Sequence, residues 1–136
     1  MIDNHLKKAE HNLKAVTDFR DIGYSDWSTS ASFYALYHCL LALTLKFGFQ
    51  SRNQSCTFAF VEDLINKKKI SLEINDIKEI FDKEIEENLS HSDKILDIRE
   101  FMQYSYTTSL DDEKFARLVE RTKHLFNKIR KEIEKE

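Results

Sequence analysis

One stretch of this chain carries apolar residues on every side of a helical wheel. Between Phe33 and Phe47, leucines, alanines and aromatic residues occupy all faces, which predicts a helix within 27–49 that the rest of the protein surrounds. The stretch is too short, and too often interrupted by Tyr, His and Thr, for a membrane span, which needs roughly 20 predominantly apolar residues. It is therefore expected to be the central helix of a soluble helical domain.

The two ends of this central helix carry their own signals. Gly48 follows the last apolar position, where glycine favours the left-handed turn that ends a helix. Ser25 and Asp26 are candidates for the N-cap, because their side chains can accept the first free N–H groups. The small polar residues of 28–32 would let another helix, or another chain, approach closely.

Narrower apolar stripes before and after this segment predict the remaining helices. They are expected over 3–20, through Phe58 to Ile65, over 76–89, from Ser90 or Ser92 to Met102, and from Asp111 or Asp112 onward. In each, apolar residues recur three or four positions apart and charged residues fill the outer face. Only a short link separates the first helix from the central one, so these two are expected to be antiparallel neighbours.

Composition agrees with a helical protein. The 136 residues include no proline and only two glycines, whereas a strand-rich fold needs many turn residues. The sequence predicts one all-α domain over 1–136, an up-and-down bundle of five or six helices. A net charge of −3 does not indicate nucleic-acid binding, although a local RNA contact stays open and DNA is not expected. Charges throughout 1–20 argue against a signal peptide and for a cytoplasmic protein without membrane contact.

The chain carries few groups suited to catalysis. It has no glycine-rich phosphate loop, no CxxC pair, no HExxH and no GxSxG. Cys39 and Cys56 lack metal-ligand spacing and are expected to be reduced thiols with a structural role. The acidic residues of 79–87 have no histidine between them at ligand spacing, which indicates a solvated face. Neither a metal site nor a cofactor is expected.

Among the five histidines, one is placed differently from the rest. His5, His11 and His124 lie in charged helices and are expected to face solvent, and His91 lies at a helix start. His38 stands within the apolar helix, where a buried imidazole needs a hydrogen-bond partner. It is either a core histidine bonded to a backbone or tyrosine oxygen, or a functional group that titrates near neutral pH.

A second candidate for function is the tract from Arg99 to Tyr106, at the end of a predicted helix. An arginine there could hold a phosphate with its fork of donors, and the hydroxyls of Tyr104 and Tyr106 could orient it. Alternatively, Arg99 forms an ordinary surface ion pair with Asp97 or Glu100. The tract alone does not decide between these two interpretations.

Together, the two stretches resemble a known family. Residues 31–43, ASFYALYHCLLAL, resemble the second helix of small prokaryotic HEPN-domain proteins, which read there much like YYAMFHAARALL. Gly48, the polar loop after it and the helix start at Cys56 follow the same order. Arg99 with its tyrosines falls where that family carries its arginine motif, shortly before the last helix. The resemblance extends over about 2–131.

This resemblance implies a helical bundle that dimerises, with the arginine motifs of both subunits lining a shared cleft. Many HEPN proteins are metal-independent ribonucleases, often toxins paired with a nucleotidyltransferase antitoxin encoded beside them. Their motif is an arginine, four to six residues, and then a histidine. The histidine moves a proton at the RNA 2′-hydroxyl or at the leaving oxygen, and the arginine neutralises the phosphate as charge builds.

This chain departs from the motif at the histidine. Counting from Arg99, Tyr104 takes that position, and Tyr106 corresponds to the tyrosine that the partner of a HEPN toxin can adenylylate. A phenol has a pKa of about 10 and is a poor base at neutral pH. His38 or His91 could replace the missing base if folding brought either near Arg99.

Two functional hypotheses follow from the resemblance. In the first, the protein is a toxin-type ribonuclease that acts through Arg99, with Tyr104, Tyr106 and His38 assisting, and pairs with a nucleotidyltransferase. In the second, it is a non-catalytic HEPN homodimer that binds a nucleotide or docks a partner protein. A third reading is a helical interaction protein unrelated to this family, in which 27–49 is only core.

Overall fold

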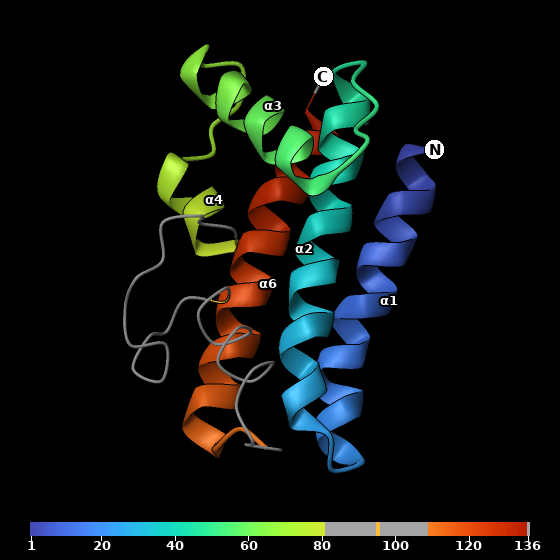
Figure 1. Cartoon of the computed structure of the whole chain (residues 1–136), viewed down its shortest axis with the longest axis vertical. Helices are drawn as coiled ribbons and strands as arrows, with labels where there is room; N and C mark the ends of the chain where they lie inside the picture. The colour runs from blue at the N-terminus through green and yellow to red at the C-terminus, as the bar shows by residue number, and fades with distance from the viewer. Residues whose placement is uncertain (81–94, 96–108, 136) are drawn as a thin grey trace.

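The computed structural model describes residues 1–80, 95 and 109–135 (Figure 1). Within these ranges there are five helices and no strand: α1 (Ile2–Asp21), α2 (Ser25–Lys46), α3 (Gln54–Asn66), α4 (Ile74–Ile80) and α6 (Asp112–Glu134). The prediction of an all-α helical bundle is confirmed. No helix of the described ranges has the length and apolar character to cross a membrane.

The predicted central helix, α2, lies between α1 and α6 (Figure 1). The first helix runs antiparallel to it, as the short link predicted, and α6 runs parallel to it. Phe33, Leu36, Leu40 and Leu43 of α2 are completely buried, and they join the apolar residues of the other helices in one core. Burial of large apolar side chains of this kind is the main source of folding free energy.

The C-terminal end of α2 follows the prediction. Gly48 has a φ of +79°, in the left-handed region that glycine adopts without strain. Its N–H donates to the carbonyl of Leu45 at 2.9 Å, and the N–H of Phe49 donates to that of Thr44 at 3.0 Å. These two bonds form the Schellman motif, which satisfies the last carbonyl groups of a helix.

The predicted N-cap of α2 is wrong. The cap residue is Tyr24, which makes no side-chain capping bond, and Ser25 and Asp26 already lie inside the helix. Ser25 has a different task, because its buried Oγ accepts the backbone N–H of Leu110 at 2.8 Å. This bond fixes the chain just before α6 begins at its cap residue Asp111, one of the two starts that the sequence predicted.

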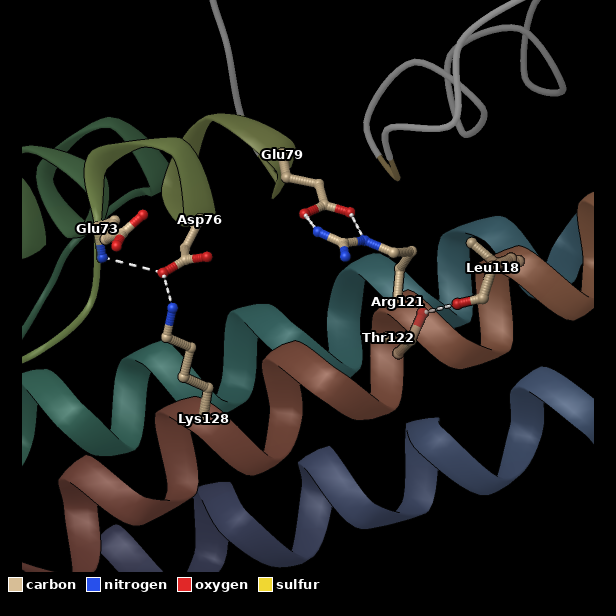
Figure 2. Close-up of polar contacts among 7 residues, drawn as sticks. All are labelled: Glu73, Asp76, Glu79, Leu118, Arg121, Thr122 and Lys128. Atoms are coloured by element: carbon tan, nitrogen blue, oxygen red, sulfur yellow. Dashed lines mark hydrogen bonds and ion pairs between the residues drawn. The ribbon is translucent and has the colours of Figure 1, made fainter.

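The small polar residues of α2 do allow close approach, and helices of the same chain make it. The Oγ of Ser28 donates to the carbonyl of Val16 in α1 at 2.5 Å. The hydroxyl groups of Ser32 and of Thr122 in α6 are 2.5 Å apart. Since Thr122 itself donates to the Leu118 carbonyl (Figure 2), it accepts from Ser32. Both serines are completely buried, so these hydroxyls hold α1 and α6 against α2.

The short helix α4 is fastened to α6 by two ion pairs (Figure 2). The carboxylate of Glu79 accepts from Nε of Arg121 at 2.8 Å and from its Nη2 at 2.5 Å. Nζ of Lys128 lies 2.6 Å from Oδ2 of Asp76. A helix of this length is not stable by itself in water, so these contacts and the burial of its apolar residues hold it in place.

The last two predicted helices before α6 are described only in part. The helix expected over 76–89 begins at Ile74 and is described to Ile80. Of the helix expected from Ser90 or Ser92 to Met102, only Ile95 is described, and it is helical and completely buried.

Candidate functional site

Most of the predicted site lies outside the described residues. Arg99, Tyr104, Tyr106 and His91 fall in this part of the chain, so their roles stay predictions. His38 is the predicted site residue that the structure describes. The candidate site is therefore built outward from His38.

His38 lies half-buried in the middle of α2 and contacts a second histidine. Its Nδ1 is 3.1 Å from Nδ1 of His5 in α1, and the two rings are inclined by only 27° with their centroids 5.4 Å apart. Within the described residues, the partner of His38 is His5 and not the backbone or tyrosine oxygen that one of the two interpretations expected. The expectation that His5 faces solvent is wrong, since His5 is half-buried. His11 and His124 are exposed, as predicted.

The contact between two Nδ1 atoms determines how the pair can hold protons. One nitrogen must donate and the other accept, so the bond forms when at most one of the rings is a cation. Burial, and then the positive charges of His5 and Lys8, lower the pKa of His38. Burial and the charged amino terminus lower the pKa of His5. No described residue hydrogen-bonds the Nε2 atom of either ring.

A polar network beside His38 ties the start of α3 to α2. The hydroxyl of Tyr37 lies 3.2 Å from that of Thr57, which in turn donates to the carbonyl of Asn53 at 3.0 Å. The hydroxyl of Ser51 also contacts that of Thr57. Asn53 caps α3 by accepting the N–H of Cys56. These bonds fix the loop between α2 and α3 next to the histidine pair.

A small cavity of about 100 Å³ adjoins His5 at this end of the molecule. Its lining residues come from the start of α1, the second half of α2 and the following loop: Met1, His5, Leu41, Thr44, Leu45, Gln50 and Ser51. A space of this size holds a few water molecules at most. The polar side chains of Gln50 and Ser51 supply oxygen and nitrogen atoms to its wall.

One side of α2, which we call the open face, is only partly covered by the described part of the chain. It consists of positions spaced three and four apart that are all exposed or half-buried: Trp27, Ser30, Tyr34, Tyr37, His38, Leu41 and Leu45. Trp27 is 57% exposed and Tyr34 is 42% exposed. Contrary to the prediction that this helix is surrounded on every side, the described residues leave the open face partly exposed. The polar groups of Ser30, Tyr34 and His38, four residues apart, were the signal for it.

The two cysteines differ in their surroundings. Both are free thiols, but Cys39 is completely buried, which suits a structural role, whereas Cys56 is exposed. Burial raises the pKa of the Cys39 thiol to about 12. In the described part of the chain, no three or more His, Cys, Asp or Glu residues are grouped so that they could hold a metal ion.

A family model matches nearly the whole chain. A family model described as HEPN domain matches residues 2–133, which include all described helices except the last residue of α6. The matched range also includes His38, Arg99, Tyr104 and Tyr106. No protein of curated function matches the chain.

Proposed function

This chain belongs to the HEPN domain family, and from that premise we propose that it is a ribonuclease whose chemistry needs no metal ion. Arg99 neutralises the phosphate, Tyr104 and Tyr106 orient it, and His38 moves the proton. The observation that carries the proposal is the bond between His5 and His38, which orients a half-buried imidazole that could replace the missing motif histidine. The alternative of a helical protein outside this family is wrong, because the family match spans residues 2–133.

The contact with His5 orients His38 for proton transfer. When Nδ1–H of His38 donates to His5, Nε2 of His38 is unprotonated and can accept the proton of the 2′-hydroxyl. The 2′-oxygen then attacks phosphorus, and the 5′-oxygen leaves with a proton. The ring is then an imidazolium, and its Nε2–H can deliver the proton to the 5′-oxygen, which returns His38 to its neutral form. Throughout, the guanidinium of Arg99 offsets the charge that builds on the phosphate oxygens.

The test is an RNA-cleavage assay on a denaturing gel in the presence of EDTA. We expect the wild type to cleave and both Arg99→Ala and His38→Asn to lose about a hundredfold or more of the rate. His124→Asn is the matched control, because His124 is an exposed histidine of α6, and it should cleave as the wild type does. Circular dichroism confirms that each variant is folded. Undiminished cleavage by folded Arg99→Ala or His38→Asn would contradict the proposed role of that residue.

The open face favours a second candidate, a non-catalytic HEPN homodimer that binds RNA or a nucleotide. Trp27 and Tyr34 expose aromatic surface on the same side of α2, and burial of such side chains dominates many interfaces. Two copies would pack their open faces together, as a two-fold axis requires.

A nucleotidyltransferase encoded beside this protein is the protein partner we expect, with Tyr106 as the residue it would modify. Co-expression and co-purification test that pairing.

Self-association can be measured through Trp27, the only tryptophan of the chain. If the open faces meet, its fluorescence emission shifts to shorter wavelength as protein concentration rises. Tyr34→Glu should abolish this shift and give a monomer in analytical ultracentrifugation, because it places a charge in the interface. Asn127→Glu is the control, since it adds the same charge at an exposed position of α6. A concentration-independent spectrum and a wild-type monomer would exclude the dimer.

A further inference from the structure

We propose that His5 and His38 form a binding site for a divalent transition-metal ion, with Cu²⁺ the preferred ion and Nδ1 of each ring the ligand atom. This inference goes beyond the proposed function, because binding requires neither RNA nor Arg99. The sequence did not indicate it, since the two histidines are 33 positions apart and only the packing of α1 on α2 brings them together.

The distance between the two nitrogens suits chelation. Metal–imidazole bonds are about 2.0 to 2.1 Å long, so two nitrogens 3.1 Å apart would subtend an angle of about 98° at a shared ion. This angle lies between the values for square-planar and tetrahedral coordination. Imidazole nitrogen is a preferred ligand of copper, zinc and nickel, and the divalent series binds Cu²⁺ most strongly.

A metal ion suits the histidine pair better than a single proton does, because the metal can bind both Nδ1 atoms. In the metal-free pair, one ring must carry its proton on Nδ1, and only the other ring offers a lone pair to the contact. A metal ion in place of that proton accepts both lone pairs at once. The packing of α1 on α2 already brings the two rings into contact, with their centroids 5.4 Å apart, so binding needs only a rotation of the rings that turns both lone pairs toward the ion.

The surroundings leave coordination positions for other ligands. The cavity of about 100 Å³ next to His5 has Gln50 and Ser51 in its wall and can hold water on the metal. The described residues offer no third His, Cys, Asp or Glu grouped with the pair. The site thus has two protein ligands and open positions, and Cu²⁺ tolerates such a site best because of its high intrinsic affinity for imidazole.

The experiment is a titration of the full chain with Cu²⁺ alone, followed by calorimetry and by electron paramagnetic resonance at one equivalent. We expect a site of one ion per chain, with hyperfine splitting from imidazole nitrogens. His5→Asn and His38→Asn should each weaken this site by at least about tenfold and remove the two-nitrogen signature. His11→Asn and His124→Asn, which change exposed histidines, should bind as the wild type does.

The double variant His5→Asn/His38→Asn gives the decisive comparison. It keeps the amino terminus, so any copper bound there appears in both proteins and is subtracted. Equal affinity and equal spectra for the wild type and the double variant would overturn the proposal. Arg99→Ala should bind copper normally, so a failure of the ribonuclease proposal and a failure of the metal site give different results.

Discussion

The two sides of α2 use polar side chains in different ways. Toward α1 and α6, Ser28 and Ser32 are completely buried, and each hydroxyl bonds a neighbouring helix. On the open face, Tyr34 and Trp27 reach solvent, and His38 bonds only one nitrogen to a described residue. On the covered side, the polar groups hold the helices together. The open face keeps the aromatic rings of Trp27 and Tyr34 exposed, which makes it the better place for function.

The largest expected effect comes from truncating one leucine on the covered side. Leu36→Ala should lower the free energy of unfolding by about 2 to 5 kcal/mol, because Leu36 is completely buried and its removal leaves a cavity. Tyr34→Ala, two positions away on the open face, should lower it by less than about 1 kcal/mol. Urea denaturation followed by circular dichroism measures both values. Equal losses would mean that the open face is part of the folding core.

A second test compares the two thiols. Cys39 lies on the covered side with its pKa raised to about 12, so both burial and protonation protect it from alkylation. In native protein at pH 8, we expect Cys56 to react with iodoacetamide at least about a hundredfold faster than Cys39. Mass spectrometry of timed samples locates the label. Cys56→Ser should leave one thiol that reacts only after unfolding, and its rapid labelling in folded protein would contradict the packing described for α2.

The histidine tests and the tyrosine test separate the uses proposed for the open face. His38→Asn changes proton transfer and metal binding, but it introduces no charge and should leave any dimer intact. Tyr34→Glu disrupts the dimer and should leave copper binding unchanged, since the described ring contact of Tyr34 is with Phe33, whereas those of His38 are with His5 and Tyr37. If the cleft of a ribonuclease needs both subunits, Tyr34→Glu also lowers cleavage, whereas a monomeric enzyme is unaffected.

Local rules predicted much of the fold. The apolar spacing located the central helix, Gly48 located its end, and Asp111 was one of two predicted starts of the last helix. These features depend on residues within one or two turns of each other. Contacts between distant residues, such as His5 with His38 in the candidate site and Ser25 with Leu110 in the fold, are encoded by no local pattern. For the same reason Ser25 looked like a cap, although its hydroxyl is used elsewhere.

The open face was missed because apolar count alone suggested complete burial. Tyr34 and Tyr37 were counted with the leucines, although each carries a hydroxyl that needs water or a partner. The hydroxyl of Tyr37 contacts that of Thr57, whereas Tyr34 is exposed. A helical wheel that distinguishes tyrosine and histidine from purely hydrocarbon side chains would have shown the open face. Arg99, Tyr104 and Tyr106 stand apart from this comparison, because they lie outside the described residues and stay predictions.

The smallest expected effect is also the most closely matched, because it compares two serines of one helix. Ser32→Ala should destabilise the protein by about 1 kcal/mol, since it removes the bond to Thr122, which still donates to Leu118. Ser30→Ala, on the open face, should stabilise it by a few tenths of a kcal/mol, roughly the helix propensity gained. Urea midpoints at equal slope measure the difference. Effects of the same sign and size would mean that the two sides of α2 do not differ in how they use polar groups.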